Sequence, residues 1–403
     1  MKSLVDINSW KDYIIFFIIF IFYSYIPTYA AAMKISIINP KNIFIISMIF
    51  IFYLNFTTKN SLFFLKIPIM KWILLHTTIV LFWFLLPNNY MDMEEFRKFI
   101  FAMMFFVAMN MLIANDDDSF SKTRVAILLV TLLAVINNVY EFFHPFAFYS
   151  ENSEYNIIGR SAGFYIDPNI AGQVIVFGLI FSYTIIPNKF KIFFLFLTLV
   201  GVVVTFSRSG MLGWLIVVLL LFRYKLIDKK SSLILFIILL ASILLLAPLL
   251  YDFIIHSFDN HSSNLINRLN FFAQSSKTDG SELERLKIML AAFDLFADNP
   301  LFGAGLGVIR HWQFHVAPHN IYLSLMAQFG LVGLASYLYL LYTLVAKAKG
   351  STKILAKIFL AYLLFMGFTS HNILTAYQTI IVLVLMSNMS YRSYIRYESK
   401  KYE

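Results

Sequence analysis

The stretch "HNIYLSLMAQFGLVGLASYLYLLYTLVA", residues 319–346, holds 28 residues without a single Asp, Glu, Lys or Arg. A helix needs about 20 apolar residues to cross the hydrocarbon core of a bilayer, so this run is long enough to do so. The whole chain shares this character, since 60% of its 403 residues are hydrophobic and only 13% are charged. Soluble domains carry about 25% charged residues. We therefore expect an all-α polytopic membrane protein.

Apolar runs of comparable length recur along the chain between short polar breaks. We interpret them as about 12 transmembrane helices in a single integral membrane domain that covers residues 1–403. The runs lie near residues 13–32, 42–57, 70–87, 96–114, 123–142, 168–186, 190–206, 209–223, 231–252, 319–346, 352–369 and 372–390. The stretch "YAAAM" after the first run resembles a signal-peptidase site, but an uncleaved anchor is more usual ahead of many later spans. The chain has no cysteine, which excludes disulfides and thiolate chemistry.

The distribution of Lys and Arg predicts the orientation of these spans. With the N-terminus in the cytoplasm, 21 of the 32 basic residues fall in the inner segments, as the positive-inside rule requires. We therefore expect a multi-pass membrane protein with both termini in the cytoplasm. The net charge of +10 is scattered between apolar runs, so it is a topology signal and does not indicate binding of nucleic acid.

Residues 253–318 form the one sizeable polar segment, which this orientation makes a large periplasmic loop. Within it, "SELERLKIMLAAFDLFADNP" (residues 281–300) predicts an amphipathic helix, with Ser281 and Glu284 as a capping box. Four residues are expected on one apolar face: Leu283, Leu286, Leu290 and Phe293. Such a helix would lie on the membrane surface or cover a cavity that opens outward.

Unusual ionisable residues lie at the outer ends of the predicted spans, namely Arg160, Arg208, Arg285, His319 and His371. Ionisable groups at membrane depth are costly, and by default they mark a functional site. Arginine forks match phosphate oxygens, and histidine can accept a proton near neutral pH. Together, these residues suggest chemistry on a lipid-linked phosphate.

Each arginine also has a structural alternative. The side chain of Arg208 could extend to lipid headgroups. Arg160 could be a solvated loop charge. Arg285 could pair with Glu282, three positions away on a solvated helix face.

The polar residues near the helix starts have structural alternatives as well. His319 could be a polar lead-in to a helix that Asn320 caps, and His371 could cap the last span together with Asn372. Asp167-Pro168 is a favourable helix start, with Asp as the cap and Pro in the first turn.

A metal site is the least favoured interpretation of the histidines. In "HWQFHVAPH", His311, His315 and His319 are four positions apart, which would align three imidazoles on a helix. Pro318 interrupts that helix just before the third histidine, and no carboxylate follows at ligand spacing. We expect no metal and no cofactor, and the sequence contains no Gly-rich phosphate loop.

Four stretches, in this order, resemble the bacterial O-antigen ligase and O-antigen polymerase superfamily. They are "GRSAGFYIDPNIAG" (159–172), "TFSRSGMLG" (205–213), "ERLKIMLAAFDLFADNPLFGAGLG" (284–307) and "PHNIYLSLMAQFGLVG" (318–333). The resemblance covers roughly residues 155–345. It implies a GT-C-type fold of twelve spans and metal-independent, inverting transfer of a glycan from undecaprenyl diphosphate onto a sugar hydroxyl, with the active site facing the periplasm.

The resemblance also implies roles for single residues. His319 matches the proposed general base, and Arg208 and Arg285 match the arginines that bind the diphosphate. Arg160 is a further expected diphosphate contact, and three residues are expected to support the site: Asn320, His371 and Asn169.

The acceptor separates the two enzymes of this superfamily. We predict a ligase of lipopolysaccharide biosynthesis, whose acceptor is a sugar of the lipid A core. The alternative is a polysaccharide polymerase, whose acceptor is a second lipid-linked repeat and whose partners could include a chain-length regulator. A flippase or exporter of lipid-linked oligosaccharides would usually show internal pseudo-symmetry. A peptidoglycan polymerase of the shape-and-division type would need a loop carboxylate, here Asp279 or Glu282.

Overall fold

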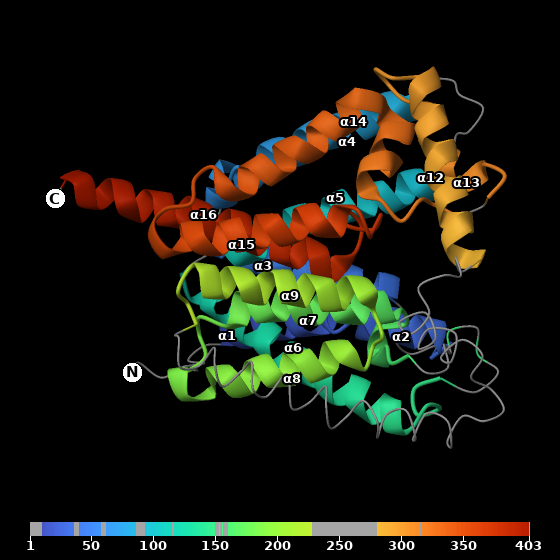
Figure 1. Cartoon of the computed structure of the whole chain (residues 1–403). Coiled ribbons are helices and arrows are strands. Elements are labelled where there is room, and N and C mark those ends of the chain that lie inside the picture. The colour runs from blue at the N-terminus through green and yellow to red at the C-terminus, as the bar shows by residue number, and fades with distance from the viewer. Residues whose placement is uncertain are drawn as a thin grey trace. The chain divides into compact units, whose positions relative to one another are not determined.

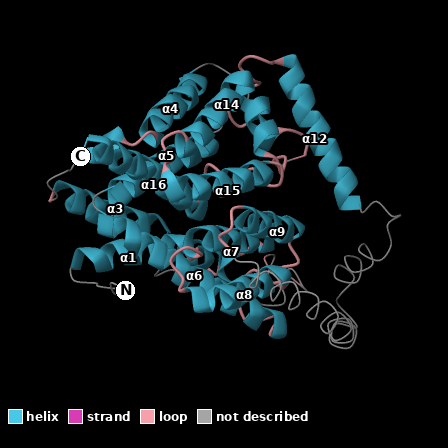
Figure 2. Cartoon of the chain, turned by 60° about the vertical axis from the view of Figure 1, so that its left-hand side comes forward, coloured by secondary structure: helices cyan, strands magenta, loops and turns pink. Residues whose placement is uncertain are grey.

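The computed structural model describes residues 10–402, apart from 36–39, 58–61, 86–92, 115–116, 150–152, 154, 156–159, 228–279 and 315. The described residues form α-helices, short 3₁₀ turns and loops, with no strand among them (Figures 1 and 2). The chain divides into two compact units. The first unit comprises residues 1–27, 35–127 and 278–403, and the second comprises residues 28–34 and 128–277.

A helix lies at the position of every predicted span except 231–252, which falls outside the described residues. These helices are α1 (Trp10–Tyr23), α2 (Ile26–Ala32), α3 (Pro40–Phe56), α4 (Ile69–Leu85), α5 (Met93–Ala114), α6 (Asp117–Phe143), α7 (Pro168–Ser182), α8 (Lys191–Val203), α9 (Arg208–Arg223), α14 (Ile321–Val345), α15 (Gly350–Gly367) and α16 (Tyr377–Tyr402). Helices α5, α14, α15 and most of α6 are long and apolar enough to cross a membrane, and so is the pair α1–α2, which bends by 46°. The count of twelve crossings and the GT-C-type arrangement remain predictions.

Exposed apolar side chains show which surface a membrane would cover. Along α3, Ile45, Ile49, Phe52 and Phe56 are all exposed, and their spacing of three and four places them on one stripe. A continuous apolar stripe of this kind is unfavourable in water and is expected against lipid. The apolar helices therefore indicate a membrane protein.

Buried amide pairs hold together the core of the first unit. Asn388 of α16 donates to Asn110 Oδ1 of α5 at 2.8 Å, and Asn110 donates to the carbonyl of Phe64 at 2.9 Å. Phe64 lies in the short 3₁₀ turn η1 (Phe63–Lys66). Between α4 and α14, His76 Nδ1 and Ser336 Oγ are 3.0 Å apart. Away from water, polar groups must find partners within the protein, so these contacts fix how the helices pair.

Residues 300–307 pass over a break in α14, and we call this contact the glycine crossing. At the break, Gly330 has φ +61°. The amide of Ala304 donates to the carbonyl of Ala327 at 2.8 Å, and that of Leu331 donates to the carbonyl of Pro300 at 2.8 Å. A Cβ at Gly303 would lie 2.4 Å from the carbonyl carbon of Gln328. Two glycines thus allow the backbones to touch, and the carbonyls freed at the break gain new donors.

The predicted loop helix is α12 (Gly280–Asp298), which packs beside α14 and the short α13 (Val308–His311). Its apolar stripe of Leu283, Leu286, Leu290 and Phe293 is exposed. The opposite stripe, which includes Ile288 and Ala292, packs into a cluster with Trp312 and Ala327. The predicted apolar face exists, but it is not the face that packs against the protein. The predicted capping box stays a prediction, because the side chain of Ser281 lies outside the described residues.

In the second unit, α7 packs against α8 and α9. The 3₁₀ turn η3 (Asn188–Phe190) leads into α8. Small residues make this packing close: a Cβ at Gly172 of α7 would lie 3.3 Å from the Cα of Gly210 of α9. Small residues at such contacts let membrane helices approach closely, and here they bring the starts of α7 and α9 together.

Candidate functional site

The second unit brings together two of the four stretches that carry the resemblance. Arg160 donates through Nε to the carbonyl of Thr205 at 3.2 Å and through Nη2 to Asn169 Oδ1 at 3.1 Å. Ser207 Oγ donates to the same Asn169 oxygen at 2.9 Å. Stretch 159–172 is therefore bound to stretch 205–213. These contacts contradict the alternative in which Arg160 is a freely solvated loop charge. The supporting role of Asn169 stays a prediction.

Both helices at this junction begin as their sequences predict. Asp167 caps α7 by accepting from the amide of Asn169 at 2.7 Å, with Pro168 in the first turn. Ser207 caps α9 by accepting from the amide of Gly210 at 3.1 Å. Arg208 is the first residue of α9 and is half-buried. The positive charge of Arg208 adds to the positive end of the helix dipole. This corner therefore favours a bound anion.

The backbone is strained directly before both caps. Ile166 has φ +66° and Phe206 has φ +48°. Such left-handed conformations are uncommon for residues with a side chain and are a true outlier for a β-branched residue. Strain of this kind persists where the surroundings over-determine it, often at functional sites.

Sequence analysis missed Glu141, which anchors the loop that carries Arg160. This buried carboxylate accepts from the amides of Ala162 at 2.7 Å and Gly163 at 2.6 Å. Those residues begin the 3₁₀ turn η2 (Gly163–Tyr165). Glu141 could have been found from the sequence, because it is an acidic residue near the end of the apolar run 123–142. An ionisable residue within a span marks a functional site by default.

The first unit brings together His319 and His371. Asn320 caps α14 by accepting from the amide of Leu323 at 3.1 Å, as predicted. His319 is exposed just before this cap. The rings of His319 and His371 meet edge to face, with centroids 5.3 Å apart. The base predicted from the resemblance thus has a second imidazole beside it.

The alternative in which His371 and Asn372 cap the last span is wrong, because α16 begins at Tyr377. Instead, the carbonyl of Asn372 accepts from the amides of Thr375 at 3.1 Å and Ala376 at 2.9 Å, which closes a turn. His371 Nδ1 is buried and has no hydrogen-bond partner. Burial lowers the pKa of His371 to about 3, helped by the positive charges of His319 and Lys98. His371 therefore stays neutral near pH 7.

This low pKa predicts acid sensitivity. Below its ordinary pKa of about 6.5, His371 takes up a proton in the unfolded chain but not in the folded protein. Folding stability should therefore fall as the pH drops from about 6.5 towards 3. We expect the apparent unfolding temperature of His371→Gln in detergent to depend less on pH than that of the wild type. The exposed His144→Gln protein is the control, and equal pH dependence in all three proteins would contradict the prediction.

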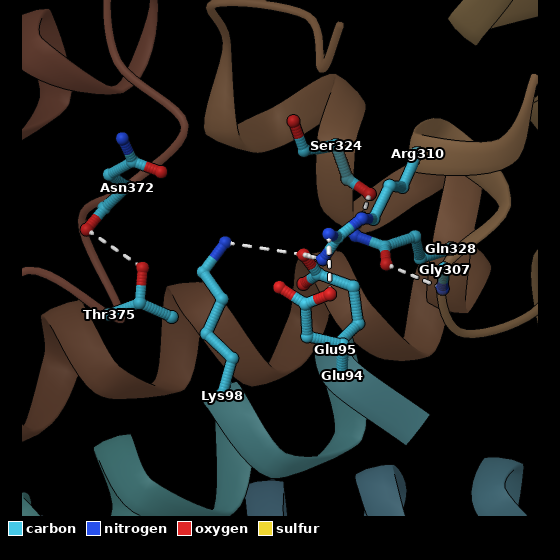
Figure 3. Close-up of polar contacts among 9 residues, drawn as sticks. All are labelled: Glu94, Glu95, Lys98, Gly307, Arg310, Ser324, Gln328, Asn372 and Thr375. Atoms are coloured by element: carbon cyan, nitrogen blue, oxygen red, sulfur yellow. Dashed lines mark hydrogen bonds and ion pairs between the residues drawn. The ribbon is translucent and has the colours of Figure 1, made fainter. Parts of the chain in front are cut away.

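A polar pocket of about 210 Å³ adjoins His371. Its walls come from the start of α5, from α13 and α14, and from the turn at residues 371–375. Arg310 binds Glu94 at 2.7 Å and Glu95 at 3.4 Å, and Lys98 also binds Glu95 at 3.4 Å (Figure 3). Sequence analysis missed these four residues, because three of them sit on a helix more than 200 positions from Arg310.

Gln328 ties this pocket to the glycine crossing. Its Oε1 accepts from the amide of Gly307 at 3.1 Å, and its Nε2 donates to the carbonyl of Ser324 at 3.2 Å (Figure 3). Stretches 284–307 and 318–333, the other two that carry the resemblance, are therefore bound together in the first unit.

Arg285 is exposed on α12. Its position, three before Ile288 and seven before Ala292, places it on the stripe that packs towards α14. Its predicted pairing with Glu282 is untested, because the Glu282 side chain, like Asp279, lies outside the described residues. Among the described residues, no group of three or more His, Asp or Glu could hold a metal ion, and His315 is not among them.

Comparison with known proteins supports the resemblance. A family model described as O-antigen ligase matches residues 193–338, a range that contains Arg208, Arg285 and His319 but not Arg160, Asn169 or His371. No curated protein matches the chain. Residues 193–338 are therefore similar to the O-antigen ligase family, as the resemblance predicts.

Proposed function

We propose that this protein transfers a glycan from undecaprenyl diphosphate to a sugar hydroxyl, with inversion and without a metal or cofactor. The observation that carries the proposal is the exposed imidazole of His319 directly before α14, which meets the ring of the half-buried His371 edge to face. The match of residues 193–338 to the O-antigen ligase family supports a membrane glycosyltransferase activity of this general kind.

In this proposal, His319 accepts the proton of the acceptor hydroxyl. The hydroxyl oxygen forms a bond to the anomeric carbon while the bond from that carbon to the diphosphate breaks, and the electron pair leaves with undecaprenyl diphosphate. A single displacement inverts the anomeric centre. Because the diphosphate is a good leaving group, no general acid is needed. His371 does not compete for the proton, because its pKa is low.

Arg208 and Arg285 bind the diphosphate in this proposal, and Arg160 is a further contact. Arginine forks stabilise the charge that develops on phosphate oxygens as the bond breaks. The cap of α9 adds backbone amides at the position of Arg208. Asn169 orients Arg160 through its hydrogen bond.

The proposed location is the inner membrane, with both termini in the cytoplasm and the site facing the periplasm. The predicted topology puts the starts of α5 and α14 and the turn at 371–375 on the same outer side. Their meeting around one pocket supports this pattern of crossings. The sequence resemblance favours a lipid A core sugar as the acceptor, and a second lipid-linked repeat is the alternative.

The diphosphate contacts are tested by Arg208→Lys and Arg285→Lys, which keep the charge and remove the fork. We expect transfer to fall by about 10- to 100-fold in each, since a hydrogen bond to a charged group contributes about 1.5–3 kcal/mol. Product is measured by mass spectrometry with purified protein in detergent and an undecaprenyl-diphosphate glycan. The exposed Arg223→Lys protein should keep wild-type transfer. Normal transfer by both test variants would remove the proposed diphosphate site.

A further inference from the structure

Lys98 of α5 borders two cavities. One is the polar pocket beside His371. The other, of about 370 Å³, is mostly apolar and lies among residues of α3, α5 and α16. Both cavities include Lys98 and Thr375 in their walls, so they adjoin at these two residues.

The polar pocket suits an uncharged sugar better than a phosphate. Arg310 faces both carboxylates, Glu94 and Glu95, so this end of the pocket carries no excess positive charge for a phosphate. The buried Nδ1 of His371 lacks a hydrogen-bond partner, and Phe99 and Leu374 add apolar surface. The volume of 210 Å³ is below the roughly 300–1,000 Å³ of sites for drug-sized ligands, which fits a single sugar ring.

The second cavity suits a lipid chain that carries a phosphate. Phe44, Ile45 and Phe101 line it, and the last two are exposed on the outside of their helices, where lipid would enter. Lys41 and Lys98 supply ammonium groups. Lys98 has three donor hydrogens and one hydrogen-bond partner, Glu95, so it retains donors for a phosphate at the junction.

We propose that the two cavities form one site for a saccharide joined through phosphate to a lipid chain, and that this saccharide is the acceptor. The sugar occupies the polar pocket next to His371 and His319, the phosphate lies at Lys98, and the lipid lies along α3, α5 and α16. The role of the saccharide as the acceptor rests on the proposed function, in which His319 is the base. The acceptor sugar then lies next to its lipid phosphate, as in a short lipid-linked repeat, and not at the far end of a lipid A core.

Binding to the full chain in detergent tests this site without any chemistry. Three kinds of probe are compared: farnesyl phosphate alone, conjugates of farnesyl phosphate with N-acetylglucosamine, galactose or rhamnose, and the three free sugars. The binding of each probe is measured by equilibrium dialysis. We expect at least one conjugate to bind 10-fold or more tightly than farnesyl phosphate and than its free sugar. Lys98→Met should weaken that binding at least 10-fold, and Asn372→Leu, which alters the sugar pocket, should reduce it towards the level of farnesyl phosphate.

The matched control is Lys353→Met, an exposed lysine of α15 that should bind as the wild type does. Lys98→Arg keeps a cationic donor and should retain most of the binding. Its binding would show that a substitution at position 98 does not by itself cause misfolding. The proposal is overturned if Lys98→Met binds every lipid probe as tightly as Lys353→Met, or if no conjugate exceeds farnesyl phosphate. His319→Ala should lose transfer but still bind the conjugate more tightly than farnesyl phosphate, so that failure of transfer and failure of this site are told apart.

Discussion

Replacement of His319 by alanine should lower the rate of glycan transfer by about 10²–10⁴-fold, the usual loss when a positioned base is removed, and leave the protein folded. The imidazole is exposed, so its removal opens no cavity, and Asn320 still caps α14. The measurement uses purified protein in detergent with an undecaprenyl-diphosphate glycan and an acceptor, and unfolding is followed by circular dichroism.

Asn320→Ala should have the opposite profile. Loss of an N-cap costs about 0.5–2 kcal/mol, so its unfolding temperature should fall more than that of His319→Ala, whereas the base remains. Wild-type turnover by His319→Ala would end the assignment of the base. Loss of wild-type turnover on addition of EDTA would instead revive a metal site that includes His311 and His315.

Gly330→Ala should destabilise the protein by about 2–5 kcal/mol. The backbone there has φ +61° and ψ −149°, a region that is almost restricted to glycine and costs about 1–3 kcal/mol for other residues. The new Cβ would also lie 2.5 Å from the carbonyl carbon of Leu301, and overpacking typically adds about 1–3 kcal/mol. The hydrogen bonds of the glycine crossing leave little freedom to relieve the contact. Chemical denaturation in detergent provides the measurement.

Gly350→Ala is the matched control for that variant. Gly350 also has a positive φ, +55°, but a Cβ there would meet nothing within 4 Å. It should therefore show the conformational cost without the steric one. If Gly330→Ala is no less stable than Gly350→Ala, the close contact in the glycine crossing does not contribute to stability.

The parts of the site that depend on neighbouring residues were predictable from the sequence. Asp167 and Asn320 accept from backbone amides within three positions, and Pro168 lies in the first turn. A helix start of this kind depends on neighbouring residues alone. The contacts of Arg160 with Asn169 and Thr205 span 9 and 45 positions, and that of Arg310 with Glu94 spans 216. Such pairs follow from how helices pack, which a local pattern does not specify.

Two other features could not be predicted from a local pattern. On α12, the stripe of Leu283 and Leu286 and the stripe of Ile288 and Ala292 both satisfy an apolar repeat, so the pattern does not say which one packs. At "TSHN", the polar residues resemble a cap, yet Asn372 closes a turn and the helix begins later. In both places the tertiary contacts select one of two locally acceptable structures.

The glycine crossing also determines how this part of the protein can move. Helix α12, which carries Arg285, and the first third of α14, which begins next to His319, are joined through backbone hydrogen bonds and a shared apolar cluster. A tilt of α12 is therefore expected to move the start of α14 with it. Arg285 and His319, which both belong to a segment that the sequence presents as a long loop, would then move together.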